Sequence, residues 1–456
     1  MLLAMNELFG TDGVRGVANE FLTPELAFAL GRAGGYVLAS HGQRRPVLVG
    51  RDTRCSGLML EHALSAGICS IGLDVWSLGI VPTPVVAWLT RQLDAAAGVM
   101  ISASHNPIDD NGIKFFASDG CKLSDALEDE IAAKVGVVET LPRAKGWKVG
   151  IVVDRRRTVK QYAAHCKSLG KPLNGKTVVI DAAYGAAYEL APKIFSELGA
   201  HVVRLHCTPN GKKINVRCGS TDLSTLRRTV AEHAGSVGVA FDGDADRALF
   251  IDERGREVSG DHVLAMRAHD LLERDELPER TIVATVMSNI GLERALAQMK
   301  ARLLRTPVGD RYVLEAMQRG GFRLGGEQSG HIIDLAANTT GDGIATAVAV
   351  LGLTAGGRQL AELADLMQRY PQVLVNIAVG DKSCLQENAS VKQAIVQAEQ
   401  ALGSEGRILV RASGTEPLIR VMVEGPEEDH IARLAESIAH EIRAAQPTGL
   451  LNARSQ

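Results

Sequence analysis

Short apolar runs separated by amphipathic stretches recur along most of this 456-residue chain, and this alternation restricts the folds open to it. Residues 47–50, 95–101 and 238–241 are almost wholly apolar and lack the polar alternation of a strand with one face in water. Residues 57–71 and 187–198 have the apolar spacing of helices that would follow such strands. Buried strands joined by helices predict parallel sheets covered on both faces, which is the α/β class.

The C-terminal part of the chain follows a different pattern. Strands are expected at 372–379, 407–412 and 419–424, and helices at 389–402 and 428–444. This order predicts a small antiparallel sheet with helices on one face, an α+β arrangement. Since a domain usually holds ~100–200 residues, the chain is expected to contain three or four of them.

Two local signals bear on the first 160 residues. Asn111-Gly112 is a common turn pair, so a turn is expected there, leading into a strand at 113–116. The charged stretch 141–157 contains Pro and Gly and is expected to be a linker or the edge of a domain.

Composition excludes several classes of protein. The formal net charge is −3, so no basic excess indicates a nucleic-acid partner, and a small anionic substrate would need a local basic pocket. The seven cysteines are scattered without a Cys-x-x-Cys pair, which favours a reducing compartment and argues against a structural zinc site. The N-terminus lacks the pattern of a signal peptide, and no apolar run is long enough to cross a bilayer. The expected location is therefore the cytoplasm.

Three aspartates, Asp242, Asp244 and Asp246, alternate with small residues directly after the apolar run 238–241. In a straight strand their carboxylates would share one face and repel each other. The small intervening residues allow the loop to curl, which would gather the carboxylates around one point. Hard oxygen ligands of this kind suit Mg²⁺ or Ca²⁺. A solvated acidic turn is the alternative, but the buried strand before the loop favours a metal site.

A serine in a polar loop is the candidate nucleophile. Residues 102–106 read Ser-Ala-Ser-His-Asn, after the apolar run 95–101 and before Pro107. Ser104 lies next to His105, which is one arrangement that activates a serine hydroxyl. Most Ser-His neighbours are ordinary turn residues, and no Gly-x-Ser-x-Gly elbow is present. The loop therefore gains weight only in combination with other sites.

A loop near the C-terminus has the composition of a phosphate site. Arg411, Ser413, Gly414 and Thr415 are followed by Arg420. Guanidinium groups, hydroxyls and backbone N–H groups freed by a glycine can together bind a phosphate dianion. A hairpin turn with surface arginines is the alternative.

Two glycine-rich loops complete the set of candidate sites. Residues 325–331 include Glu327, Ser329 and His331, whose polar ends suit sugar hydroxyls or an amine, although a plain turn is the simpler interpretation of this loop alone. Residues 10–16 contain three glycines and Arg15 and form a candidate anion loop. They do not match the Gly-x-Gly-x-x-Gly fingerprint of dinucleotide sites.

Together and in this order, the motifs resemble those of the α-D-phosphohexomutase family over essentially the whole chain. They comprise 9–16, 101–107 with 111–116, 242–247, 326–331 with 340–344, and 411–425. The resemblance implies four domains around a central cleft, three of them related α/β units and the fourth an α+β lid. The domains are expected at 1–158 with the serine loop, 159–257 with the metal loop, 258–371 with the sugar-binding loop and 372–456 with the phosphate-binding loop.

The resemblance also implies residue roles. Ser104 would be a phosphoserine and would share one Mg²⁺ with Asp242, Asp244 and Asp246. The candidates for acid–base or charge-stabilising roles are Lys114, Arg247 and His331. Substrate binding would involve Thr11, Arg15, His105, Glu327, Ser329, Arg411, Ser413, Gly414, Thr415 and Arg420.

The implied reaction interconverts glucosamine 6-phosphate and glucosamine 1-phosphate and feeds UDP-N-acetylglucosamine synthesis. The phosphoserine would give its phosphoryl group to the sugar and take the other phosphate back from the 1,6-bisphosphate. A hexose or glucosamine 1,6-bisphosphate would act as activator. The only partner expected is the sugar phosphate, with no nucleic acid and no membrane. A homodimer is compatible with the sequence.

Three alternatives remain open on the sequence. A sibling mutase would act on glucose or mannose phosphates, although Gln328 in the 325–331 loop favours glucosamine. A metal-dependent phosphatase with a serine phosphoenzyme would need a hydrated site. A non-catalytic sugar-phosphate binder would need neither the serine nor the three aspartates.

Overall fold

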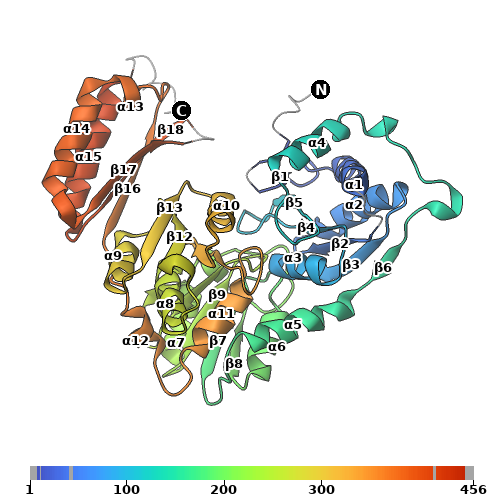
Figure 1. Ribbon diagram of the computed structural model, residues 1–456, viewed down its shortest axis with the longest axis horizontal. Coiled ribbons are helices and arrows are strands. Elements are labelled where there is room, and N and C mark those ends of the chain that lie inside the picture. The colour runs from blue at the N-terminus through green and yellow to red at the C-terminus, as the bar shows by residue number, and fades with distance from the viewer. Residues whose placement is uncertain (1–7, 11, 41–44, 414–416, 447–456) are drawn as a thin grey trace. The chain divides into compact units, whose positions relative to one another are not determined.

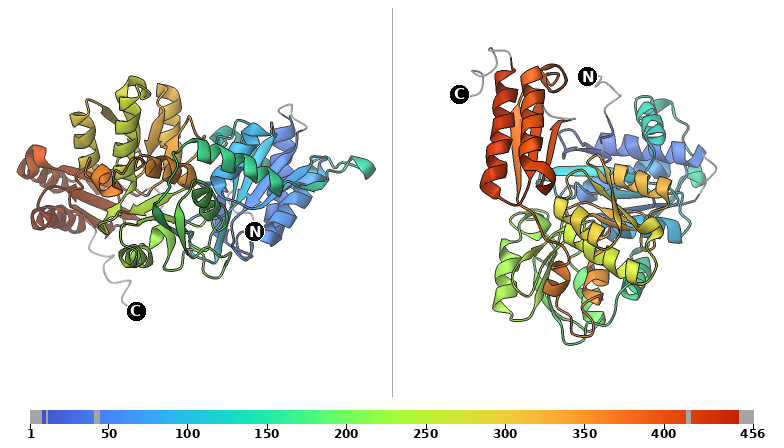
Figure 2. Two further views of the ribbon diagram at one scale, coloured as in Figure 1. Left: turned by 90° about the horizontal axis from the view of Figure 1, so that it is seen from below. Right: turned by 60° about the vertical axis from the view of Figure 1, so that its left-hand side comes forward.

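A computed structural model of the chain describes residues 8–10, 12–40, 45–413 and 417–446. The chain forms two compact units (Figures 1 and 2). The first comprises Met1–Met287 with Met299–Leu366, and the second comprises Ser288–Gln298 with Met367–Gln456. Among the described residues, the structure contains no helix with the length and apolar character needed to cross a membrane.

The first sheet of the larger unit has six strands in the order β1-β5-β4-β2-β3-β6. These strands are β1 (Val14–Val17), β2 (Val47–Arg51), β3 (Val75–Ile80), β4 (Ala97–Ile101), β5 (Asp110–Phe116) and β6 (Val152–Asp154). Its helices are α1 (Pro24–Ser40), α2 (Gly57–Ser70), α3 (Thr83–Gln92) and α4 (Asp125–Val135). The apolar residues of β2 and all residues of β4 are buried, which confirms the α/β prediction, and β6 shows that the expected linker at 141–157 contributes an edge strand.

Two predictions for this sheet are wrong. The sheet is mixed rather than purely parallel, because β5 pairs antiparallel with both β4 and β1. Asn111 and Gly112 lie inside β5 and form no turn. Asn111 is buried and its side chain accepts a hydrogen bond of 2.8 Å from the backbone N–H of Gly112. A Cβ at Gly112 would lie 2.5 Å from the carbonyl oxygen of Ser102, so this glycine permits close packing of the backbone.

The second sheet has the order β11-β10-β9-β7-β8. Its strands are β7 (Thr177–Asp181), β8 (His201–Leu205), β9 (Val237–Phe241), β10 (Ala248–Ile251) and β11 (Glu257–Val258). The neighbouring helices in sequence are α5 (Val159–Ser168), α6 (Leu190–Glu197) and α7 (Ser224–Glu232). Strand β7 is parallel to β8 and to β9, which confirms the predicted βαβ unit. Asp181 and Ala240 are partners in that register, so the loops after β7 and β9 begin at the same edge of the sheet.

The third sheet has the order β13-β12-β14-β15. Its strands are β12 (Thr281–Thr285), β13 (Arg302–Thr306), β14 (Leu324–Gly326) and β15 (Ile332–Asp334). The helices of this region are α8 (Gly260–Glu273), α10 (Asp310–Gly320), α11 (Gly343–Gly352) and α12 (Leu360–Ala364), whereas α9 (Ile290–Gln298) belongs to the smaller unit. Strand β12 is parallel to β13 and β14, while β15 returns antiparallel to β14. The turn between β14 and β15 is the 327–331 loop.

The smaller unit contains a three-stranded antiparallel sheet in the order β16-β18-β17. Its elements are β16 (Gln372–Ala378), α13 (Cys384–Glu387), α14 (Ala389–Leu402), β17 (Arg407–Ala412), β18 (Leu418–Glu424) and α15 (Glu428–Ala444). The helices α14 and α15 lie side by side against the sheet (Figures 1 and 2). Buried side chains of β18 and α15, such as Val421 and Ile438, share one apolar core. The predicted α+β arrangement is confirmed.

Candidate active site

The loops that follow β4 and β9 meet in the larger unit. The hydroxyl of Ser104 donates a hydrogen bond of 2.6 Å to Asp242 Oδ2, across 138 residues of sequence. Both side chains are buried, Ser104 at 2% exposure and Asp242 at 0%. The structure therefore brings together the serine and the aspartate that the sequence singled out separately.

The three aspartates after β9 form one tight cluster. Asp242, Asp244 and Asp246 are all buried, and each offers a carboxylate oxygen within 4.8 Å of the others. Ala245 has a φ of 57°, the left-handed conformation that curls the loop. Among the described residues, Asp244 Oδ1 and Asp246 Oδ1 have no hydrogen-bond partner. Buried carboxylate oxygens without partners are costly, and a hard divalent cation would satisfy them.

Electrostatics support the same interpretation. Burial and the carboxylates of Asp246 and Asp244 raise the pKa of Asp242. Burial and Asp246 raise the pKa of Asp244 to about 6. Burial opposes ionisation of Asp246 as well, but His331 and Arg247 lower the pKa of that carboxyl overall. The raised pKa values of Asp242 and Asp244 show that the neighbouring cations of the protein do not fully compensate the negative charge of the buried cluster.

The backbone of Ser104 is strained and firmly held. Its φ is 51°, a left-handed value that is rare for a residue with a side chain and typical of functional loops. Its N–H donates to the hydroxyl of Ser102 over 2.9 Å, and its carbonyl accepts from Arg54 over 3.0 Å and from Asn215 over 2.8 Å. Its own hydroxyl lies 3.2 Å from Nδ1 of His105, which is at the surface. The loop is therefore preorganised with the hydroxyl directed at the aspartate cluster.

Arg54 and Asp52 organise this loop, and the sequence analysis missed both. Asp52 is 0% exposed, and it accepts hydrogen bonds from Arg54 Nε over 3.0 Å and from the hydroxyl of Ser102 over 2.6 Å. The remaining guanidinium nitrogens of Arg54 donate to the backbone carbonyls of Ser104, Asn106, Pro107 and Asp110. An Asp and an Arg two residues apart after a buried strand were the available signal.

Thr83, at the start of α3, is a second residue that the sequence analysis missed. Its hydroxyl donates to Asp244 Oδ2, and its backbone N–H donates to the carbonyl of Asp244 over 2.9 Å. The backbone carbonyl of Ala245 accepts a bond of 3.1 Å from the N–H of Gly343, at the start of α11. Segments next to the first and third sheets thus fix the aspartate loop of the second.

Lys114, on β5, belongs to a network of charged side chains from several segments. Its ammonium lies 2.7 Å from Asp12 Oδ1 and 3.8 Å from Asp310 Oδ2. Burial opposes the charge, but Asp12 and Asp310 raise the pKa of Lys114 overall. Arg15 also pairs with Asp12. Thr11, which was predicted to bind substrate from the 10–16 loop, lies outside the described residues.

The 327–331 loop lies against the loop that carries the three aspartates. Arg247 and His331 form an antiparallel backbone bridge, and His331 Nδ1 lies 3.5 Å from Asp246 Oδ2. Burial opposes protonation of His331, but Asp246 raises its pKa. The hydroxyl of Ser329 donates to Glu327 Oε2 over 3.1 Å. His331 and Arg247 therefore line the same loop cluster as the aspartates, and Glu327 and Ser329 form a polar pair beside them.

The smaller unit carries the predicted phosphate loop. Arg411 and Arg420 are cross-strand partners on β17 and β18, so two like charges are opposite each other, and burial and Arg420 lower the pKa of Arg411. The ammonium of Lys382 donates to the carbonyl of Ser413 over 2.7 Å, which adds a third cation that the sequence analysis missed. Gly414 and Thr415 lie outside the described residues.

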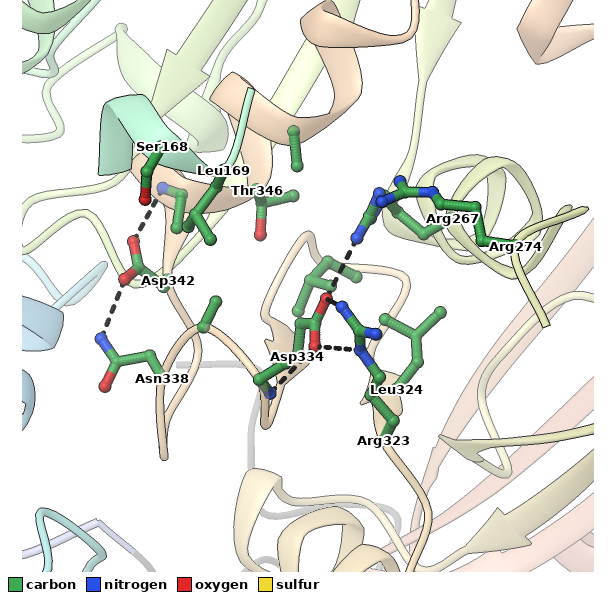
Figure 3. A pocket seen from close by; sticks show the side chains of 15 residues that line it. Ser168, Leu169, Arg267, Arg274, Arg323, Leu324, Asp334, Asn338, Asp342 and Thr346 are labelled. Atoms are coloured by element: carbon green, nitrogen blue, oxygen red, sulfur yellow. Dashed lines mark hydrogen bonds and ion pairs between the residues drawn. The ribbon is translucent and has the colours of Figure 1, made fainter. Parts of the chain in front are cut away.

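A cavity of about 160 Å³ elsewhere in the larger unit is a different kind of site (Figure 3). Asp334 in its wall accepts from Arg323 over 2.9 Å and from Arg267 over 3.0 Å. Asp342 accepts from Asn338 over 2.9 Å and from Tyr162 over 2.7 Å. Because both carboxyl groups already accept hydrogen bonds from neighbouring side chains, the cavity has the character of structural packing rather than of a reactive centre.

Comparison with known proteins places this geometry in a family. Four family profiles match in succession, described as phosphoglucomutase/phosphomannomutase alpha/beta/alpha domain I at residues 6–140, domain II at 159–255, domain III at 259–370 and the C-terminal domain at 374–441. A phosphoglucosamine mutase of Symbiobacterium thermophilum is 53% identical over 443 residues, which cover 96% of this chain and 99% of that protein.

Two solved structures share the fold. A phosphoglucomutase/phosphomannomutase family protein from Burkholderia thailandensis has a TM-score of 0.82 at 23% identity, covering 98% of this chain and 99% of that one. An Aspergillus fumigatus N-acetylphosphoglucosamine mutase, solved with GlcNAc-6P and magnesium, has a TM-score of 0.69 at 17% identity and covers 96% of each chain. At these identities the two structures support the fold alone.

Proposed function

This chain belongs to the phosphoglucomutase/phosphomannomutase family, and we propose that it interconverts glucosamine 6-phosphate and glucosamine 1-phosphate through a phosphoserine at position 104. The observation that carries the proposal is the 2.6 Å contact between the hydroxyl of Ser104 and Asp242, inside a cluster of three buried carboxylates. The substrate is inferred from the phosphoglucosamine mutase that is 53% identical over 96% of the chain.

We propose that Asp242, Asp244 and Asp246 hold one Mg²⁺ together with the phosphate of Ser104. Two carboxylate oxygens, Asp244 Oδ1 and Asp246 Oδ1, lack a hydrogen-bond partner among the described residues and fit such an ion, since Mg²⁺ takes carboxylate and phosphate oxygens. When bound, Mg²⁺ neutralises charge on the transferring phosphoryl group. The same charge explains why three carboxyl groups can lie so close together.

The protein groups around the aspartates have separate proposed tasks. Arg247 and Lys114 keep their charge, because their buried carboxylate neighbours raise the pKa of each despite burial, and they stabilise the phosphoryl group in transit. His331 is the group among the three whose ordinary pKa lies nearest neutrality, so we assign proton exchange with the sugar hydroxyl to it. His105 is part of the serine loop, and Arg15 pairs with Asp12 next to Lys114; both are proposed to bind the substrate.

Recognition of the sugar phosphate is assigned to two loops. Glu327 and Ser329 are proposed to bind the sugar hydroxyls and the amine. Arg411, Ser413 and Arg420 are proposed to bind the phosphate that is not being transferred, because a dianion would relieve the repulsion between the two paired arginines. Thr11, Gly414 and Thr415 are proposed to assist through hydroxyl and backbone groups.

The proposed cycle conserves the phosphate on the enzyme. Phosphoserine 104 gives its phosphoryl group to the free hydroxyl of the sugar monophosphate, which produces the 1,6-bisphosphate. The bisphosphate turns over and returns its other phosphate to Ser104. A hexose 1,6-bisphosphate would recharge any serine that loses its phosphate. We also retain domain boundaries after residues 158, 257 and 371 as a proposal.

One assay separates the mutase from its alternatives. The phosphorylated protein is incubated with Mg²⁺, glucosamine 6-phosphate and a trace of glucose 1,6-bisphosphate, and the products are followed by ³¹P NMR. Appearance of glucosamine 1-phosphate supports the mutase, release of inorganic phosphate alone indicates a phosphatase, and no change indicates a binder. Faster conversion of glucose or mannose phosphates would indicate a sibling mutase.

Ser104→Ala tests the proposed carrier directly. It is expected to reduce turnover by at least ~10³-fold, because without the hydroxyl the enzyme cannot carry the phosphoryl group that the proposed cycle transfers. Ser168→Ala is the matched control, since the exposed Ser168 lies at the end of α5, away from the serine loop, and its hydroxyl donates to the carbonyl of His165 over 2.7 Å. Undiminished turnover of Ser104→Ala would exclude this serine as the phosphoryl carrier.

A further inference from the structure

A second group of metal-ligating side chains lies in the second sheet, away from the three aspartates. Asp181 ends β7, His206 follows β8, and Cys218 lies in the loop before α7. Asp181 is paired with Leu205 in the parallel register of β7 and β8, so the two strand ends place residues 181 and 206 together. One ligand atom from each side chain, Asp181 carboxylate, His206 nitrogen and Cys218 sulfur, lies within 4.8 Å of the other two.

Asp181 lacks the partners expected of a buried carboxylate. It is 0% exposed, and its Oδ1 accepts a bond of 2.9 Å from the N–H of Ala183. Its Oδ2 has no hydrogen-bond partner among the described residues. Leaving such an oxygen buried and unpaired costs free energy, so it points to a ligand.

The approach of His206 gives a second indication. Its Nδ1 lies 3.0 Å from Asp181 Oδ1, yet among the described residues this nitrogen has no partner that meets hydrogen-bond geometry. Two ligands of one zinc ion, each ~2.0–2.1 Å from the metal, lie about 3.3 Å apart in a tetrahedral site. The side chain of His206 is 19% exposed, so an ion and a completing water can reach the group from solvent.

We propose that Asp181, His206 and Cys218 form a second cation site that takes Zn²⁺ or a similar divalent transition metal. The mixed oxygen, nitrogen and sulfur ligands suit such ions, whereas Mg²⁺ prefers oxygen alone. Three protein ligands leave a fourth position for water. On binding, the Cys218 thiol forms a sulfur–metal bond and releases its proton to solvent.

The site would stabilise a loop that the reaction uses. Asn215, three residues before Cys218, donates to the carbonyl of Ser104 over 2.8 Å. Gly219, directly after the cysteine, has a φ of 64°, and a Cβ there would lie 2.3 Å from the carbonyl of Phe241 at the end of β9. A metal at Cys218 would therefore fix the loop that positions the serine backbone. This role is independent of which sugar phosphate the enzyme accepts.

The scattered cysteines predict no structural zinc site of the Cys-x-x-Cys kind, and the proposed site is of a different kind. The sequence rule recognises ligands that are close together in the chain, such as Cys-x-x-Cys. Here the ligands come from positions 181, 206 and 218, on three separate segments that only the sheet brings together. Burial and the Asp181 and Asp222 carboxylates raise the pKa of Cys218 to about 12, so without a metal the thiol stays protonated.

Cobalt titration tests the proposal on the full chain. Metal-free protein is titrated with Co²⁺ in saturating Mg²⁺, which occupies the three aspartates, and the spectrum is recorded under reducing conditions. One equivalent of Co²⁺ is expected to produce the near-ultraviolet thiolate charge-transfer band, and Zn²⁺ is expected to displace it. Cys218→Ser is expected to abolish the band, and His206→Gln to weaken Co²⁺ binding by ~100-fold or more, since even partners outside the ligand sphere contribute ~10–100-fold.

Two controls fix the interpretation. Cys207→Ser removes a neighbouring thiol that donates to backbone carbonyls, at 3.2 Å to Leu205 and 3.6 Å to Ile180, and it should leave the band unchanged. Asp242→Asn should also leave it unchanged. Absence of the band in the wild-type protein, its persistence in folded Cys218→Ser, or its loss in Asp242→Asn would overturn the proposal. If Cys218→Ser does not fold, unchanged Co²⁺ affinity in the more exposed His206→Gln would overturn it equally.

Discussion

Replacing Arg54 by Met should destabilise the serine loop more than any single change on the surface. Arg54 lies 2% exposed beside Asp52, which is 0% exposed. Its guanidinium pairs with that carboxylate over 3.0 Å and donates to four carbonyls of the serine loop and its flanks. Met preserves most of the apolar bulk and removes all of these donors.

The expected cost follows from what the substitution leaves behind. Removing one partner of a buried ion pair costs about 3–5 kcal/mol, because the other charge stays buried and uncompensated. Burial already raises the pKa of Asp52 despite Arg54, so part of this cost should be relieved at acidic pH, where the carboxyl becomes neutral. The double variant Arg54→Met/Asp52→Asn should recover at least ~1.5 kcal/mol, because it removes the unpaired charge as well.

The loss of stability can be measured selectively. The three tryptophans, Trp76, Trp88 and Trp147, all belong to the part of the chain that contains the first sheet, so their fluorescence in urea reports on the region around Arg54. The mutase rate should fall by ~10²-fold, as expected for a misplacement of about 1 Å at the reacting group.

Two results would refute this reasoning. One is a decrease of less than ~1 kcal/mol in the free energy of unfolding of Arg54→Met. It would mean that water or a shift of the loop compensates the Asp52 carboxylate once the guanidinium is gone. The other is a double variant no more stable than the single one, since the cost would then not come from the unpaired Asp52 carboxylate. Arg254→Met is a suitable control, because the exposed pair of Arg254 with Asp365 at 3.2 Å should contribute only ~0–1 kcal/mol.

Three further predictions use other contacts. Thr83→Val should raise the Mg²⁺ concentration for half-maximal rate by ~10-fold, because it removes the hydroxyl that orients Asp244, and an unchanged Mg²⁺ dependence would contradict that role. Burial raises the pKa of Glu128 from 4.5 to about 7, so ionisation of this side chain should reduce the stability of the fold as pH rises through this range. Glu128→Gln should therefore raise the melting temperature by about 3 °C at pH 8 but not at pH 4. An equal rise at both pH values would contradict this explanation. Arg407→Met should cost the smaller unit about 3–5 kcal/mol, because Glu424 is 0% exposed and pairs with Arg407 at 2.7 Å; unchanged amide exchange protection of β18 would contradict it.

The order of the elements could be predicted from the sequence because it depends on local properties. The apolar runs at β2, β4 and β9 are buried on both faces, and continuous hydrophobicity reports such burial directly. The antiparallel C-terminal sheet likewise follows from alternating burial along β16 and from the helices between its strands. The loop with the three aspartates could be recognised from local sequence too, since Asp242, Asp244 and Asp246 lie within five residues of one another.

The pairing of distant segments depended on the tertiary structure. The pair Asn111-Gly112 predicted a turn, yet both residues lie in β5. The glycine is needed there because the backbone of Ser102 approaches it closely. The same holds for Arg54, whose side chain reaches the serine loop about 50 residues away, and for Cys218, which meets residues 181 and 206. Residue patterns report which side chains are buried, whereas strand register and the packing of sheets decide which buried groups meet. The candidate active site depends on such contacts between distant segments, and the hydrogen bond between Ser104 and Asp242 is the central one.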